Sequence, residues 1–140
     1  MNQILEWEAF AVLLSRILLG VLFLFQGYDK LFKFKISGVE SVYKPDLVKR
    51  GIPVVLIRPS IFISSWIEFL GGILLLPGLF MQPVLAILGL NLIGAAIAFS
   101  IARPMWDMQY FFPRFALLIF LLIAPTSWNI YSLDYYLNIY

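Results

Sequence analysis

The sequence predicts an all-α integral membrane protein, a bundle of four transmembrane helices with both termini outside, on the periplasmic side. The chain has 140 residues, of which 62% are hydrophobic and 13% are charged. Soluble domains average about 45–50% apolar and about 25% charged residues, so this chain cannot cover itself with polar surface. The apolar residues are collected in four runs separated by short charged or proline-containing segments. Four runs leave no room for a soluble domain, and residues 1–140 are expected to form one membrane domain.

The transmembrane helices are expected at residues 10–28, 60–80, 83–102 and 110–125. The first helix ends where Asp29 and Lys30 bring charge to the membrane surface. Residues 31–59 form the longest connection, which is expected to lie on this surface and to end at Pro59.

The second and third helices are separated only by Met81-Gln82-Pro83. So short a turn predicts an antiparallel hairpin, and proline suits the first turn of the third helix. That helix ends before Arg103-Pro104. The fourth has Arg114 within its first turns, and the long side chain of Arg114 can reach back to the membrane surface. The aromatic residues beyond it, from Trp128 to Tyr140, indicate a tail in the membrane interface.

The orientation follows from the positions of the basic residues. Cytoplasmic loops carry an excess of lysine and arginine. Nine such residues fall on the side of the first and third connections: Lys30, Lys33, Lys35, Lys44, Lys49, Arg50, Arg58, Arg103 and Arg114. The opposite side has none, so both connections are expected in the cytoplasm of a bacterium and the protein in its cytoplasmic (inner) membrane. Because these charges flank apolar helices, the net charge of +2 does not indicate a nucleic-acid partner.

The chain contains neither cysteine nor histidine. Their absence excludes disulfide exchange, cysteine-ligated iron–sulfur clusters and histidine-ligated haem, zinc or copper. No phosphate-binding glycine loop and no nucleophile with a histidine base is present. We therefore expect no metal site, no intrinsic cofactor and no catalysis by this chain alone.

Glu68 lies near the middle of the second predicted helix. An uncompensated charge there costs about 2.5–3.5 kcal/mol on insertion scales, so its side chain must face protein or water. Two interpretations stay open: Glu68 handles protons or binds a ligand, or it is the buried partner of a cation. Arg16 is the expected cation, and Asn91 in the third helix could join them in an intramembrane polar cluster. Glycines and serines near Glu68 predict a helix-packing face.

Three further polar residues stand at the cytoplasmic end of the first helix: Gln26, Asp29 and Lys30. They could line a mouth of the bundle, although interfacial polar residues also simply end a helix. Both interpretations stay open from the sequence.

Several short motifs along the chain resemble those of the DoxX family. They are Arg16-Ile17-Leu18-Leu19-Gly20, Phe25-Gln26-Gly27-Tyr28-Asp29-Lys30, Gly51-Ile52-Pro53, Glu68-Phe69-Leu70-Gly71-Gly72, Pro77-Gly78 and Ser132-Leu133-Asp134. The resemblance implies a four-helix membrane protein, as in the DoxD-like subunit of thiosulfate:quinone oxidoreductase. It also implies a partner role beside separately encoded proteins. This chain departs from the family pattern before Ser132, where the family often has a glycine-rich approach and this chain has Ala124-Pro125-Thr126-Ser127-Trp128.

Three functions agree with these observations. The first is an accessory or anchoring subunit of a larger membrane complex, favoured by the missing catalytic groups. The second is the membrane subunit of a quinone-linked, thiosulfate:quinone oxidoreductase-like enzyme, in which Glu68 moves protons and Arg16 stabilises an anion. There a quinone would meet an electron donor on another subunit. The third is permeation of a small solute between the helices. The lipid bilayer is a partner in all three.

Overall fold

The computed structural model describes residues 3–102 and 108–139, and helices dominate it. The described residues contain no β-strand. The elements in order are α1 (Gln3–Tyr28), the π-helix η1 (Asp29–Lys33), α2 (Lys35–Lys49), α3 (Val54–Leu75), α4 (Met81–Ala102), α5 (Met108–Ile123), the 3-10 helix η2 (Thr126–Trp128) and α6 (Leu133–Leu137).

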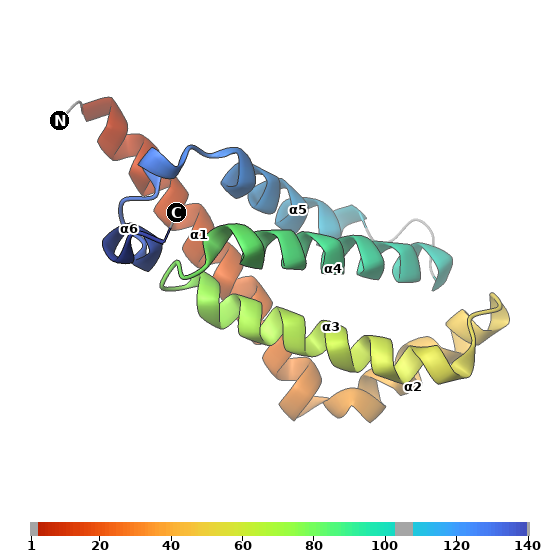
Figure 1. Cartoon of the computed structure of the whole chain (residues 1–140). Coiled ribbons are helices and arrows are strands. Elements are labelled where there is room, and N and C mark those ends of the chain that lie inside the picture. Colours follow the sequence, from red (N-terminus) through yellow and green to blue (C-terminus); the bar gives the residue numbers. More distant parts are fainter. Residues whose placement is uncertain (1–2, 103–107, 140) are drawn as a thin grey trace.

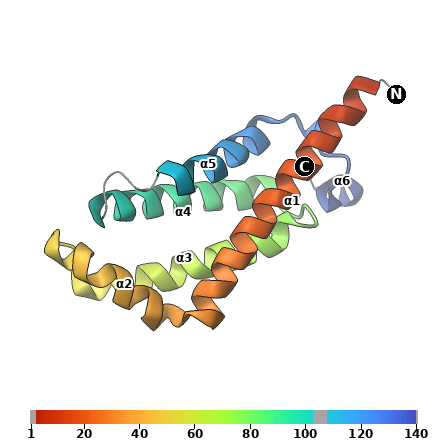
Figure 2. The ribbon, with the colours of Figure 1, turned by 180° about the vertical axis from the view of Figure 1, so that it is seen from behind.

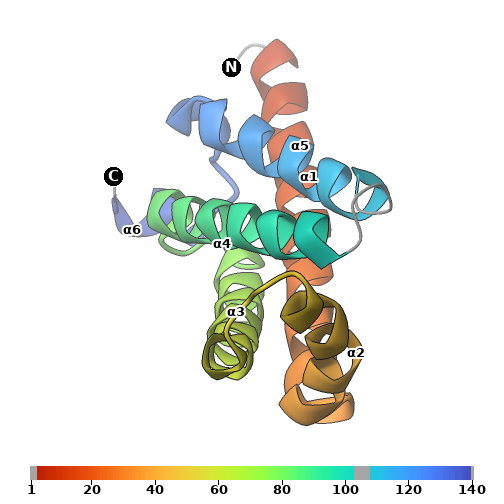
Figure 3. The ribbon, with the colours of Figure 1, turned by 90° about the vertical axis from the view of Figure 1, so that its right-hand side faces the viewer.

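The helices form a bundle in which α3 and α4 run antiparallel and α1 crosses them obliquely (Figures 1 and 2). α5 lies along α4, whereas α2 lies beside α3 (Figure 3). The start of α1, the α3–α4 turn and α6 share one end of the bundle, hereafter the terminal end. η1 and α2 mark the other end, hereafter the α2 end.

Three helical segments are long and apolar enough to cross a membrane: Glu6–Lys33, Val54–Leu75 and Met81–Ala102. A fourth apolar segment, Phe111–Ile123, is shorter. The 16 residues of α5 span about 24 Å at 1.5 Å per residue, which is less than the hydrocarbon core of a bilayer. The described helices therefore contain three segments of spanning length and one short apolar helix.

The second predicted helix was placed several residues too late. α3 begins at Val54 and ends at Leu75, and Pro59 lies inside it. Pro53 takes an extended conformation and starts the helix, and Pro59, in its second turn, removes one helix bond without ending the helix. The prediction that Pro59 ends a surface connection is therefore wrong. Most of that connection is itself helical, as η1 and α2.

The turn between α3 and α4 also differs from the prediction. It covers residues 76–80, and Gly78 (φ 74°) and Phe80 (φ 51°) take left-handed conformations in it. Pro77 and Gly78 end α3 because a proline and a positive-φ glycine cannot continue a helix. α4 then starts at Met81, so Pro83 lies in its first turn, as predicted.

The core lies where α1, α3, α4 and α5 meet. Its fully buried apolar side chains are Leu19, Phe23, Leu75, Leu85, Leu88 and Leu118. α1 and α3 approach at two glycines. A Cβ added to Gly27 would lie 2.6 Å from Phe69 Cα, and one added to Gly72 would lie 2.6 Å from Leu24 Cα. The two backbones touch at these points because glycine has no side chain.

The C-terminal segment folds back onto the α3–α4 turn. Leu133 N donates to Pro77 O (3.0 Å), and Asp134 N donates to Gly78 O (3.1 Å). The tail predicted from its aromatic residues is thus hydrogen-bonded to the bundle, with Tyr136 exposed and Trp128 packed against the core. Tyr140 lies outside the described residues.

Candidate functional site

Glu68 is enclosed within the bundle, with 1% of its side chain exposed. Lys30 of η1 donates to both carboxylate oxygens, with Nζ 2.9 Å from Oε1 and 2.8 Å from Oε2. The lysine side chain is 20% exposed. The pair therefore joins α3 to the end of α1 and neutralises the buried carboxylate.

Three neutral side chains converge on the same carboxylate oxygen, Oε1, at longer distances. Gln26 Nε2 and Ser64 Oγ lie 3.5 Å away, and Asn91 Nδ2 lies 3.4 Å away. We call Gln26, Lys30, Ser64, Glu68 and Asn91 the Glu68 cluster. It draws on α1, η1, α3 and α4, so one carboxylate links three of the long helices.

The close approach at Gly27 explains how Lys30 reaches Glu68. Gly27 lies against the backbone of Phe69, the residue next to Glu68. Lys30 follows three residues later, on the same face of the chain. The π-helix begins there and closes with Phe34 N donating to Asp29 O (2.8 Å). A π-helix has a wider turn than an α-helix. η1 therefore changes the direction of the chain between Lys30 and the start of α2.

The predicted pairing of Arg16 with Glu68 is wrong. Arg16 is 2% exposed but lies toward the terminal end, where Nη2 donates to Tyr131 O (2.8 Å). Its guanidinium also packs against Gly78. Of the predicted cluster of Arg16, Glu68 and Asn91, the contact between Glu68 and Asn91 is present. Arg16 contacts Tyr131 instead. Arg16 on α1 and Lys30 on η1 follow one helical stripe in the sequence, and Lys30 pairs with Glu68 because of the position at which α1 crosses α3.

A second polar cluster surrounds Arg16 at the terminal end. Asp134, 3% exposed, accepts from Phe80 N (2.8 Å) and Met81 N (2.7 Å) and so caps the start of α4. Ser132 caps α6 by accepting from Tyr135 N (3.2 Å). The motif Ser132-Leu133-Asp134 thus fixes the C-terminal segment to the α3–α4 turn.

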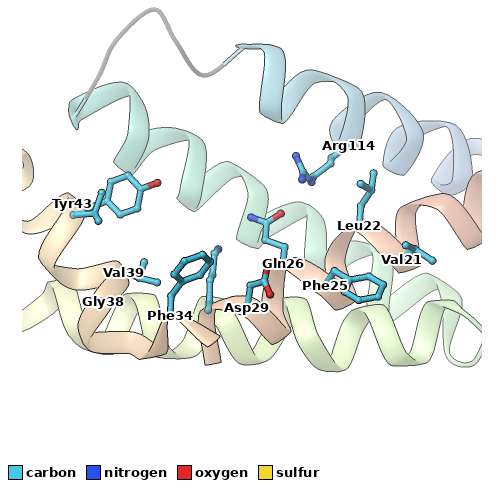
Figure 4. Close-up of a pocket in the computed structure, with 12 residues that line it drawn as sticks. Val21, Leu22, Phe25, Gln26, Asp29, Phe34, Gly38, Val39, Tyr43 and Arg114 are labelled. Atoms are coloured by element: carbon cyan, nitrogen blue, oxygen red, sulfur yellow. The ribbon is translucent and has the colours of Figure 1, made fainter. Parts of the chain in front are cut away.

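A cavity of about 650 Å³ adjoins the Glu68 cluster (Figure 4). Gln26, Asp29 and Lys30, the predicted mouth residues, all line it. Tyr43 of α2 and Arg114 of α5 complete its polar lining. Sequence reasoning missed Tyr43 because α2 was taken for a connection. It predicted only that the side chain of Arg114 can reach the membrane surface, and the structure adds that this side chain lines the cavity.

A comparison with protein-family models finds the DoxX model over residues 11–101. The chain belongs to the DoxX family. The match includes Arg16, the segment from Gln26 to Lys30, Glu68 and Asn91, and ends before Arg114 and Asp134. Together with the apolar helices, it identifies this DoxX-family chain as a multi-pass membrane protein in contact with the lipid bilayer. No curated protein and no solved structure matches the chain.

Proposed function

We propose that this DoxX-family chain is an accessory subunit that anchors a larger complex in the bacterial cytoplasmic membrane. The observation that carries this proposal is the enclosure of Glu68: its charge is neutralised by Lys30, and it links three long helices. A carboxylate held in this way serves a rigid scaffold, because each added partner favours one arrangement of the helices. Scaffold subunits need such rigidity and no catalytic groups of their own.

In the proposed arrangement four helices cross the membrane and both termini are periplasmic. α5 would complete the fourth crossing together with the residues around it. Its course along α4 and the return of the C-terminal segment to the α3–α4 turn support this arrangement. The basic residues of η1 and α2 would face the cytoplasm, as the distribution of lysine and arginine favours.

Affinity purification of the tagged chain from its own membranes in mild detergent tests the proposal. Native mass spectrometry of the product should detect a second protein in a fixed ratio. The same ratio is expected for a variant with Lys30→Met and Glu68→Met, which removes both charges but keeps side-chain bulk. Recovery of the chain alone, at native expression and in several mild detergents, would contradict the accessory role.

The second candidate is the membrane subunit of a quinone-linked oxidoreductase. It is favoured by the position of Lys30, which contacts Glu68 on one side and lines the cavity on the other. Lys30 and Arg114 could donate to the carbonyl oxygens of a quinone, which would accept electrons supplied by another subunit. Glu68 and Lys30 would hold the accompanying proton beside the cavity. This function predicts that the double variant keeps its partner but loses quinone-dependent turnover.

Permeation remains a sequence-based prediction that no specific contact favours. The two polar clusters occupy different halves of the bundle. Leu19, Phe23 and Leu75, all fully buried, lie between them. A polar solute passing from one cluster to the other would have to cross this apolar layer.

A further inference from the structure

The cavity beside the Glu68 cluster has an apolar wall, and its volume of about 650 Å³ falls in the range of about 300–1,000 Å³ found for ligand sites. α1 and α5 form one side of it, and η1 and α2 the other (Figure 4). The apolar wall consists of Val21, Leu22, Phe25, Phe34, Val39 and Val42. Such a wall suits the acyl chains of a lipid.

The polar residues of the cavity combine cations with acceptors, and Figure 4 shows Gln26 and Asp29 between the apolar residues of α1 and the residues of α2. Lys30 and Arg114 supply positive charge, and Asp29 supplies a carboxylate. Gln26 turns Nε2 toward Glu68, which leaves its Oε1 buried and without a hydrogen-bond partner among residues 3–102 and 108–139. A molecule that complements these residues offers an acidic or acceptor oxygen to the cations and an N–H or O–H donor to Asp29.

We propose that this cavity binds the head group of a phospholipid that carries both a phosphate and a primary ammonium group, as phosphatidylethanolamine does. The phosphate lies by Arg114 and Lys30, since arginine and lysine are the usual phosphate partners. The ammonium group donates to Asp29. The acyl chains follow Val21, Leu22 and Phe25 of α1 into the bilayer. This site does not depend on the accessory role proposed above.

The mixed lining discriminates among the other molecules of a membrane. A quinone offers acceptor oxygens only, so Asp29 would stay without a donor. A phosphatidylcholine head group has the same phosphate and the same charge but no N–H donor. Phosphatidylglycerol lacks the cation that Asp29 favours. Phosphatidylethanolamine alone among these satisfies both the cations and the acceptors.

Native mass spectrometry of the purified, delipidated full chain tests the site directly. Phosphatidylethanolamine and phosphatidylcholine with identical acyl chains are titrated separately, and the dissociation constant of the first bound lipid is measured. We expect phosphatidylethanolamine to bind about tenfold more tightly, a difference of about 1.4 kcal/mol. Phosphatidylglycerol and a quinone with its quinol are titrated in the same way.

Three variants connect this preference to the cavity. Asp29→Asn should abolish the preference for phosphatidylethanolamine while leaving phosphatidylcholine binding unchanged, which also shows that the variant is folded. Arg114→Gln should weaken both lipids about equally, because both carry the phosphate. Arg58→Gln is the matched control, since Arg58 is an exposed cation that does not line the cavity; it should change neither constant.

Several results would overturn the proposal. Equal binding of the two lipids would indicate only general contact with the bilayer. An undiminished preference in Asp29→Asn would place the selective site elsewhere. Tighter binding of phosphatidylglycerol would indicate a simple basic site. Displacement of phosphatidylethanolamine by the quinone or quinol in a one-to-one ratio would assign the cavity to the quinone-linked function instead.

Discussion

At the scale of single residues, the ion pair between Lys30 and Glu68 holds a buried charge inside the bundle. Removing one member of a buried pair leaves an uncompensated charge, whereas removing both often changes stability little. The bonds from Lys30 are short, and the three neutral donors lie farther away. The lysine therefore dominates the stabilisation of the Glu68 carboxylate.

Glu68→Gln should lower the free energy of unfolding by about 3 kcal/mol, the lower end for a broken buried pair, because Lys30 keeps part of its side chain in contact with solvent. The double variant with Lys30→Met and Glu68→Met should return to within about 1 kcal/mol of the native chain. Denaturant unfolding in micelles measures both. Glu6→Gln, at an exposed position near the start of α1, is the control and should change stability by about 0.5 kcal/mol or less. A double variant as unstable as Glu68→Gln would contradict a structural ion pair.

Two glycines control the approach of α1 to α3. Gly27→Ala should destabilise the chain by about 1–3 kcal/mol, because the new methyl group would meet the backbone of Phe69 and force the helices apart. Gly94→Ala is the matched control: a Cβ there meets nothing within 4 Å, and alanine favours the helix by up to about 1 kcal/mol. Thermal unfolding of both variants in the same detergent compares them. Equal melting temperatures would argue against a close contact at Gly27.

At the scale of elements, the start of α4 depends on a residue more than fifty positions away in the sequence. The first backbone N–H groups of a helix lack partners within it. Asp134 accepts from two such groups at Phe80 and Met81, in a place where solvent is excluded. α6 therefore acts as a cap for the α3–α4 hairpin and holds the turn in place.

Asp134→Ala should lower stability by about 2 kcal/mol, the upper end for the loss of a helix cap, because two N–H groups lose their acceptor. Asp134→Asn should lower stability by about half as much as Asp134→Ala, because its side chain keeps one oxygen that can accept a hydrogen bond. Melting temperatures in detergent rank the native chain, Asp134→Asn and Asp134→Ala by stability. Tyr136→Ala, at an exposed position of the same short helix, should stay within about 0.5 kcal/mol of the native chain. If Asp134→Ala behaves like this control, the cap contributes nothing to stability.

At the scale of the whole molecule, the bundle has two chemically different ends. The terminal end holds Arg16 and the cap at Asp134, and the α2 end holds the Glu68 cluster, the cavity and most of the basic residues. A protein of this kind crosses the membrane in one orientation because the basic end resists translocation.

The absence of native cysteine allows single cysteines to report this orientation. Lys49→Cys on α2 should react with a membrane-impermeant maleimide only after the cytoplasmic side is exposed. Trp7→Cys on α1 and Tyr136→Cys on α6 should react in intact cells. All three positions are exposed in the bundle. Labelling of Tyr136→Cys from the cytoplasm would show that α5 does not cross, and labelling of Lys49→Cys from outside would reverse the whole topology.

The sequence alone determined the class of this protein and the approximate positions of its apolar helices, although the second helix begins earlier than predicted. Long apolar runs between charged segments leave a chain few alternatives to helices in a membrane, because every backbone polar group must then be bonded within its own segment. For the same reason, the ends of the third predicted helix are nearly correct. Glu68 and Asn91 could be selected as partners because polar residues within apolar helices must face each other or water.

Only the tertiary structure decided which cation neutralises Glu68 and where the cavity lies. Arg16 on α1 and Lys30 on η1 lie on one helical stripe of the sequence, so helical periodicity fits either one as the partner of Glu68. The choice depends on the crossing point of α1 and α3, which is fixed by the contact of Gly27 with Phe69. The cavity likewise needs Tyr43 and Arg114, which come from helices far apart in the sequence. Local sequence determines the length and polarity of each helix, whereas contacts between helices set their relative positions, and these positions define the site.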